Sequence, residues 1–232
     1  MRDTYQARPV VGAPSGYRVF LALLNFLAAT AVIAALTVQI TDLVLNDAFV
    51  PERYFSYFTI QTSLANIFVL VLTGIVGLQT ARDSAGIAAL RANFVAYSII
   101  TGAIYNALLR DMPGAEGSYA SPIQWPNEIT HVWIPLYFAL DWVINPHRHK
   151  LPGWTMITGI IFPALWFGFT LTRGYLTDWY PYAFLNPTGA AGWAGVGVYA
   201  AGISLIIIAL VTAAALVNMI HHKLHPGNQL DR

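Results

Sequence analysis

The sequence contains no cysteine and few charged residues. The absence of cysteine excludes disulfides, thiolate metal sites and cysteine nucleophiles. Charged residues make up 10% of the 232-residue chain, whereas about 25% is usual in a soluble domain. The net charge of +1 comes without a basic block, so no nucleic acid partner is expected. Hydrophobic residues make up 56%, and the mean hydropathy is +0.56. We therefore expect a lipid bilayer to solvate part of the chain.

Six apolar runs are long enough to cross a bilayer, which takes about 20 mostly apolar residues in a helix. They are Val19–Ile40, a run between Arg53 and Arg82, Ala92–Leu109, Ile129–Ile144, Pro152–Thr172 and Trp193–Ile220. The fourth is the weakest, because it reaches Asp141 early and Asn145-Pro146 ends it. The runs lack the alternation of barrel strands. The predicted fold class is an all-α integral membrane protein, with a six-transmembrane-helix bundle over residues 17–222.

Basic residues divide unevenly between the two sides that these spans define. One side holds Arg2, Arg8, Arg18, Arg82, Arg91, Arg148, Lys150, Lys223 and Arg232, and the other holds only Arg53, Arg110 and Arg173. Lys and Arg collect in cytoplasmic loops. The sequence thus predicts a multi-pass protein of the cell (plasma) membrane with both termini cytoplasmic. Residues 1–16 are interpreted as a flexible cytoplasmic tail, and residues 223–232 as a second tail.

Polar side chains form stripes within the spans, where facing lipid would be costly. On the second span they are Thr59, Thr62, Ser63 and Asn66, at helical spacing i, i+3, i+4 and i+7. On the third span they are Ser98, Thr101, Tyr105 and Asn106. Such residues often serve only as hydrogen-bonding contacts between helices. The stripes alone therefore fit either packing or a buried site.

The fourth span begins with Asn127, Glu128 and His131, which helical spacing can bring together. His131, Thr59 and Asn106 all fall at the outer ends of their spans, so bundle packing can gather them. The remaining histidines, His147, His149, His221, His222 and His225, lie at inner ends. We interpret them as charged cytoplasmic flanks rather than a metal site. Asp141 is expected to pair with Arg148 or to meet water. No metal or cofactor is expected.

Three segments resemble a known family. YFTIQTSLANIF, NEITHVWIPLYFALDW and WYPYAFLNP are similar to segments of the androgen-induced and androgen-dependent TFPI-regulating membrane proteins and their bacterial relatives, over about Arg53–Pro187. The resemblance implies a six-span hydrolase that cleaves fatty acid esters of hydroxy fatty acids. It also implies that Thr59 is the nucleophile and that His131, ahead of Pro135, is the family histidine. Glu128 departs from the animal pattern, which has a second histidine there.

The residues are chemically suited to that reaction. A threonine hydroxyl needs a base to remove its proton, and an imidazole suits the task. Glu128 or Asn127 can orient the imidazole, and Asn66, Asn106 or Tyr105 can stabilise an oxyanion. The predicted function is hydrolysis of lipid (fatty-acyl) esters, with membrane lipids or such esters as partners and no oligomeric state predicted. The alternative is a non-enzymatic membrane protein, either a small-ligand carrier or transporter or a structural subunit. An outer cavity that reaches both Thr59 and His131, within hydrogen-bond range or through one water, favours the enzyme.

Overall fold

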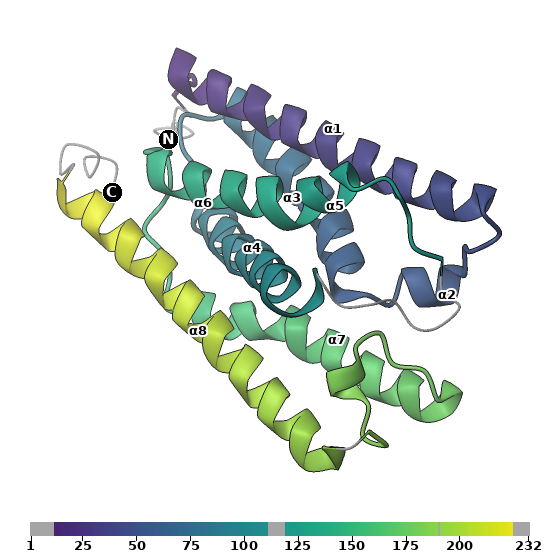
Figure 1. The fold of residues 1–232 in the computed structure, drawn as a ribbon. Coiled ribbons are helices and arrows are strands. Elements are labelled where there is room, and N and C mark those ends of the chain that lie inside the picture. The colour runs from purple at the N-terminus through teal and green to yellow at the C-terminus, as the bar shows by residue number, and fades with distance from the viewer. Residues whose placement is uncertain (1–11, 111–118, 190, 225–232) are drawn as a thin grey trace, which may run out of the picture.

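The computed structural model describes residues 12–110, 119–189 and 191–224, and within these ranges the chain forms helices and no strand (Figure 1). The elements are α1 (Gly16–Leu45), α2 (Pro51–Tyr54), α3 (Phe58–Gln79), α4 (Ala85–Ile104), η1 (Tyr105–Leu109), α5 (Trp125–Glu128), η2 (Ile129–Trp133), α6 (Ile134–Ile144), α7 (Thr155–Thr177), η3 (Ala183–Leu185) and α8 (Gly192–Leu224). Five of these stretches are long and apolar enough to cross a membrane: α1, α3, α4 with η1, α7 and α8. The all-helical fold predicted from the sequence is confirmed over the described residues, and the five long apolar helices are consistent with a membrane protein.

The predicted fourth span is a helix built from three consecutive segments. The segments α5, η2 and α6 follow one another without a break from Trp125 to Ile144, and η2 is a π-helical turn. This helix is not among the five helices that are long and apolar enough to cross a membrane, so the count of six spans stays a prediction. It ends where Asn145 adopts an extended conformation ahead of Pro146, a residue that disfavours helix in its predecessor.

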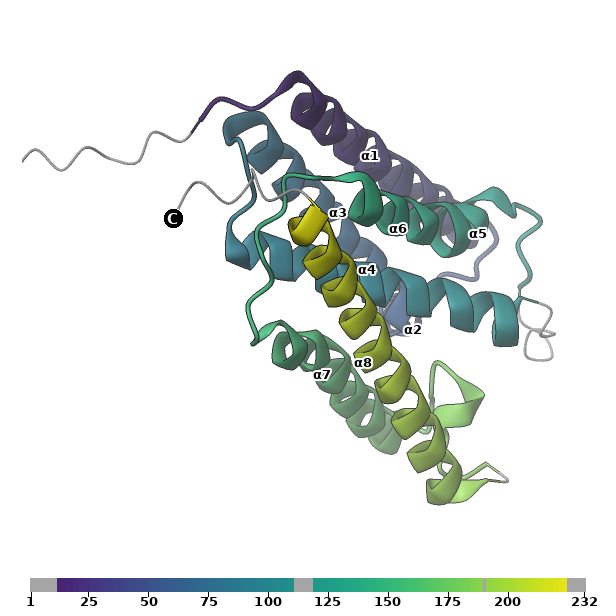
Figure 2. The same cartoon turned by 90° about the vertical axis from the view of Figure 1, so that its left-hand side faces the viewer.

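Helix α4 forms the centre of the bundle. It packs against α3, α6, α7 and α8, while α1 packs along α3. Figures 1 and 2 show α4 enclosed by these neighbours. In its most apolar window 72% of the residues are buried, against 17% in α7 and in α8. Helices α7 and α8 therefore present most of their surface outward, as expected for contact with lipid.

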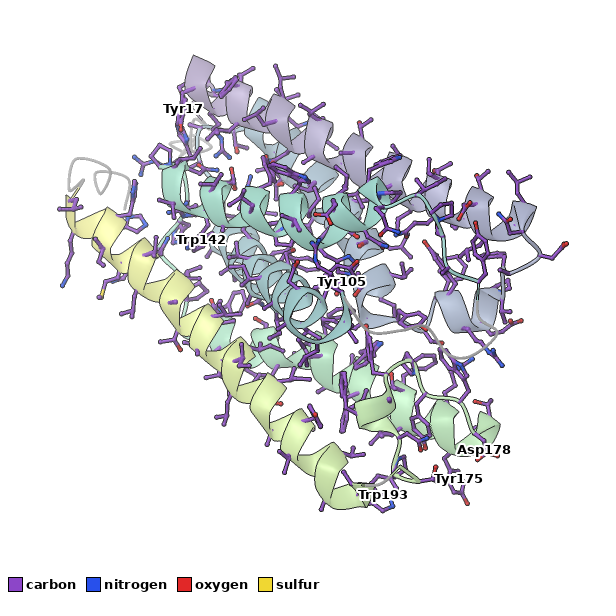
Figure 3. All side chains as sticks on the ribbon, viewed as in Figure 1. Tyr17, Tyr105, Trp142, Tyr175, Asp178 and Trp193 are labelled. Carbon is purple, nitrogen blue, oxygen red and sulfur yellow. The ribbon has the colours of Figure 1, made fainter. Side chains whose placement is uncertain are left out.

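The first and the last described helices, α1 and α8, both contact the α6–α7 loop at one end of the bundle. Ser15 Oγ, the N-cap of α1, lies 3.2 Å from His147 Nε2 in the α6–α7 loop. Asn218 Nδ2 of α8 donates to the His149 carbonyl at 3.2 Å. Figure 3 shows Tyr17 and Trp142 at this end and Asp178 at the opposite one. The predictions for residues 1–11 and 225–232 fall outside the described residues.

A buried ion-pair network ties three helices together at this end. Asp83, just before α4, accepts from Arg18 Nη2 at 2.8 Å and lies 2.9 Å from Arg91 Nε. Arg91 Nη1 also pairs with Asp141 Oδ2 at 2.9 Å. Arg148, the expected partner of Asp141, instead donates to its backbone carbonyl at 3.4 Å. The sequence-based pairing was wrong because the guanidinium of Arg91 reaches this carboxylate from the neighbouring helix α4.

Candidate functional site

Thr59 lies in the first turn of α3, at the end of the bundle opposite the ion-pair network. The helix begins after Tyr57, whose side chain makes no capping hydrogen bond. The first backbone N–H groups of any helix lack partners within the helix, and they carry a partial positive charge. The Thr59 hydroxyl therefore lies at the positive end of the helix, beside first-turn amides that meet the Tyr182 hydroxyl.

His131 is buried in the π-helical turn η2, with 7% of its surface exposed. Its Nδ1 lies 3.0 Å from the Asn127 carbonyl oxygen and 3.0 Å from Thr130 Oγ1. A carbonyl oxygen only accepts hydrogen bonds, so the proton of the neutral ring belongs on Nδ1. This tautomer leaves Nε2 as the basic nitrogen. The backbone of Asn127 thus holds the ring as a base.

The His131 backbone is held as closely as its ring. Pro135 lacks the N–H that would donate to the His131 carbonyl within a regular helix. Asn106 Nδ2 fills that role at 3.1 Å and also donates to the Gly102 carbonyl at 2.8 Å. A Cβ on Gly102 would lie 2.7 Å from the His131 carbonyl oxygen, so glycine allows the close approach of the two helices. Asn106 therefore positions His131 through its main chain.

Tyr105 stacks on the His131 ring, with the two ring centroids 3.8 Å apart and the planes at 20°. It begins the π-helical turn η1 at the end of α4 and is labelled in Figure 3. The Arg110 guanidinium lies over the Tyr105 ring, 5.5 Å from its centroid. Glu128 pairs with Arg110, at 2.7 Å between Oε1 and Nη1. The Glu128 carboxylate is thus engaged with a cation, and Nδ1 of His131 is held by other groups.

A cavity of about 600 Å³ is lined by both Thr59 and His131. We call it the polar cavity; its side chains come from α1, α3, η1, the α5–η2 helix and the loop after α7, and they include Gln39, Asp42, Tyr57, Thr59, Tyr105, Asn127, Thr130, His131, Trp179 and Tyr182. Both halves of the predicted catalytic pair therefore line one space.

A second cavity, of about 290 Å³, is also lined by Thr59. We call it the apolar cavity, because aliphatic and aromatic groups from α3, α4, α7 and α8 make up most of its wall: Phe58, Ile100, Ile104, Ile160, Pro163, Phe167, Ala200, Ile203 and Ile207. Thr59, Leu109 and Tyr182 line both cavities. Thr59 thus lies at the junction of the apolar cavity and the polar cavity.

Tyr182 is a site residue that the sequence-based search for candidates missed. It lies in the loop before η3, is 8% exposed, and its hydroxyl is in hydrogen-bonding contact with the Thr59 side chain. Burial raises the pKa of Tyr182 to about 12. The segment WYPYAFLNP, already noted for its family resemblance, contains this residue and was the available signal.

The other predicted oxyanion and orienting residues divide by position. Tyr105 and Asn127 line the polar cavity, and the Asn127 side chain accepts from Gln39 Nε2 at 3.0 Å. Asn66 is buried deeper in α3, where it accepts from Ser98 Oγ at 3.3 Å, and it lines neither cavity. Asn106 and Glu128 also lie outside the two cavity walls.

Comparisons with protein-family models, with curated proteins and with solved structures find no match for this chain. Its function is therefore inferred from the geometry and chemistry of the site.

Proposed function

We propose that this chain is a membrane-embedded hydrolase of lipid (fatty-acyl) esters, with Thr59 as nucleophile and His131 as general base. The polar cavity carries the proposal, because both side chains line it. The tautomer of His131 supports the role of base, since Nδ1 is held by a carbonyl oxygen. The resemblance of these segments to the androgen-induced family of threonine hydrolases implies the same reaction.

The reaction divides into two acyl transfers. His131 Nε2 accepts the Thr59 hydroxyl proton while Thr59 Oγ1 attacks the ester carbonyl carbon. The bond to the alcohol then breaks, and the imidazolium returns the proton to the departing oxygen. The acyl group is left esterified to Thr59. A water molecule, deprotonated by the same imidazole, attacks this ester, releases the fatty acid and restores the Thr59 hydroxyl.

The two cavities support a lipid ester as substrate. An acyl chain fits the apolar cavity, where each buried methylene contributes about 0.8 kcal/mol. The polar cavity supplies water and room for the alcohol part of the ester. Thr59, at the junction of the two, meets the carbonyl that joins the acyl chain to the alcohol. Access from the bilayer is supported by the sparse packing of α7 and α8, whose apolar windows are 17% buried.

The proposed setting is the cell (plasma) membrane, with six crossings and both termini cytoplasmic. The excess of Lys and Arg at the end that contains Arg18, Arg91 and Arg148 supports this orientation. The site then lies in the outer part of the membrane, where water reaches the polar cavity. The carrier alternative has less support, because Thr62, Ser63 and Asn66, at most 3% exposed, pack the interior beneath Thr59.

Hydrolysis of long-chain p-nitrophenyl esters by the purified protein tests the proposal. Thr59→Ala and His131→Ala should each lower kcat/KM on the order of 10⁴-fold, because nucleophile and base act as a unit. Thr62→Val is the matched control, since Thr62 lies on the same helix face, is 1% exposed and lines neither cavity. Wild-type turnover by Thr59→Ala would overturn the proposal.

A further inference from the structure

A hydrolase of this kind needs a donor for the oxyanion that forms on the substrate carbonyl oxygen. Of the three candidates from the sequence, Tyr105 alone lines a cavity, and its ring is stacked on the His131 ring. Asn66 lies outside both cavities, and the amide nitrogen of Asn106 is already bonded to two carbonyl oxygens. We propose that Tyr182 donates the hydrogen bond that stabilises this oxyanion. The inference rests on the proposed function and adds a third catalytic residue to it.

The backbone brings Tyr182 over the start of α3. Helix α7 ends at Asp178, whose φ of 54° lies in the left-handed region that Asp tolerates. The chain then turns back, and a Cβ on Gly174 would overlap the Tyr180 ring, so the loop lies directly on α7. Tyr182 follows this closely packed turn. Its position is therefore fixed by the fold and not by a free surface loop.

Aromatic rings hold the Tyr182 side chain on three sides. The ring stacks on Phe184 at 5.2 Å with an interplanar angle of 5°, and it meets Tyr57 edge-on at 5.6 Å. Trp166 lies 5.9 Å away, and its own Nε1 donates to the Ser56 carbonyl. A ring enclosed in this way directs its hydroxyl in one direction, a form of preorganisation that oxyanion donors require.

The Tyr182 hydroxyl lies against the atoms that would react. Its oxygen accepts hydrogen bonds from the Thr59 side chain and from the backbone amides of Phe58 and Thr59, which partly offset the rise in the pKa of Tyr182. Those amides belong to the first turn of α3, whose N–H groups lack partners within the helix. Because the phenol oxygen is the acceptor in these contacts, the phenol's own proton remains for a carbonyl oxygen bound beside Thr59 Oγ1. A donor that is fixed in place before the reaction in this way is what stabilises an oxyanion.

The protonation state of the phenol suits a donor. Burial raises the pKa of Tyr182 to about 12, so the hydroxyl keeps its proton at neutral pH. A phenol in this state is a poor competitor of His131 for the role of base. During attack no proton leaves Tyr182: the oxyanion receives a hydrogen bond from it, and the bond weakens again when the carbonyl re-forms.

Tyr182→Phe removes the hydroxyl and keeps the ring. The expected result is a decrease in kcat of about 10²- to 10³-fold, as is typical for the loss of one oxyanion donor, with KM within about 3-fold. Affinity for a long-chain trifluoromethyl ketone, which forms a tetrahedral adduct with a hydroxyl nucleophile, should fall by a similar factor. Tyr199→Phe is the control, because Tyr199 also stacks on Phe184, at 4.8 Å, but lines neither cavity.

The outcomes separate this inference from the function on which it rests. Thr59→Ala without activity, together with Tyr182→Phe within about 3-fold of wild-type kcat, leaves the hydrolase in place and overturns the role of Tyr182. A rise in KM alone, with unchanged affinity for the ketone, also overturns the role of Tyr182, because that result would mean that the hydroxyl only contacts the bound substrate. Full activity of Thr59→Ala overturns the proposed function itself. An unchanged melting temperature of Tyr182→Phe excludes a folding defect as the cause of lost turnover.

Discussion

At the scale of single residues, the imidazole of His131 is oriented by main-chain and hydroxyl oxygens. Its Nδ1 lies 3.0 Å from the Asn127 carbonyl and 3.0 Å from Thr130 Oγ1. In serine hydrolases a carboxylate usually takes this place and also stabilises the charged imidazolium. A neutral carbonyl fixes the tautomer without adding a negative charge to the membrane interior, where a buried charge is costly.

The first prediction concerns Glu128, which the sequence suggested as an orienting group. Its carboxylate pairs with Arg110, and both side chains are more than a third exposed. An exposed ion pair contributes about 1 kcal/mol or less. We expect Glu128→Gln to keep kcat/KM within about 3-fold of wild type and to shift the midpoint of thermal unfolding little. Glu52→Gln, on the exposed helix α2, is the matched control. A decrease in turnover of 100-fold for Glu128→Gln alone would restore its orienting role.

The second prediction concerns the apolar cavity, whose wall includes Ala200 of α8. A phenyl ring at this position fills space that an acyl chain would occupy. Ala200→Phe should therefore lower kcat/KM for long-chain esters by about 10-fold or more, since two lost methylene contacts of about 0.8 kcal/mol each give that factor. Acetate esters, which do not reach the cavity, should be hydrolysed as before. Ala213→Phe, exposed on the same helix and outside both cavity walls, is the control. Equal loss for short and long chains would contradict the assignment of the acyl site.

At the scale of elements, two π-helical turns meet at the site. The turn η1 ends the α4 helix and supplies Tyr105, and η2 supplies His131. Such turns are rare and occur frequently at functional sites, because they redirect side chains and leave main-chain groups free. Here the freed groups are bonded across the two helices through Asn106. The close contact between the helices depends on the lack of a side chain at Gly102.

The third prediction tests that contact. A Cβ on Gly102 would lie 2.7 Å from the His131 carbonyl oxygen and 3.0 Å from Pro135 Cγ. Gly102→Ala should cost about 1–3 kcal/mol in unfolding free energy, the usual range for overpacking. It should also lower kcat by up to about 10²-fold, because it displaces His131. Gly168→Ala, with no heavy atom within 4 Å of the new Cβ, should leave activity unchanged. Comparable stability and turnover for both variants would show that the contact does not position His131.

At the scale of the whole molecule, the two ends of the bundle differ in chemistry. The end with Thr59 and His131 contains two cavities, whereas the other end is tied by Arg18, Asp83 and Arg91. Asp83 joins α1 to α4 through two arginines, with its side chain fully buried. The ion pairs at this end hold the helices together behind the two cavities at the opposite end.

The fourth prediction follows from this network. Asp83→Asn leaves the buried guanidinium group of Arg18 without a carboxylate and leaves Arg91 with Asp141 alone, and breaking a buried pair typically costs about 3–5 kcal/mol. We expect a strongly lowered melting temperature in detergent micelles. Asp178→Asn makes the same chemical change at an exposed left-handed position, which Asn tolerates, and should melt as the wild type does. Equal melting of the two variants would mean that the network contributes little to stability.

The fifth prediction concerns topology. Both ends of the described chain lie at the end of the bundle rich in arginine, and an even number of crossings places both termini on one side. Tags at either terminus should therefore be protected from external protease in intact cells. Cleavage of one tag alone would mean an odd number of crossings, and the helix from Trp125 to Ile144 would be the one that fails to cross.

The sequence predicted the parts of the site that depend on local pattern. Helical spacing and span direction placed Thr59 and His131 at one depth, and the structure brings them to one cavity. The role of Tyr182 was not predicted because it lies in a loop. Loops have no hydrophobic periodicity, so the sequence does not show that this loop folds back onto α3. The pairing of Asp141 with Arg91 was missed because it depends on the rotation of α4 against α6. Asn106 bonds to the His131 carbonyl, which Pro135 leaves without its usual N–H donor. This contact joins two helices, so the sequence alone could not predict it.

Covalent labelling of the purified protein with a fluorophosphonate probe, followed by peptide mass mapping, tests the central claim most directly. Such a probe reacts with an activated hydroxyl nucleophile and leaves a stable adduct. We expect an adduct on Thr59 that is lost in Thr59→Ala and much reduced in His131→Ala, while Thr62→Val is labelled as the wild type is. An adduct on another residue, or labelling that persists unchanged in Thr59→Ala, would contradict it.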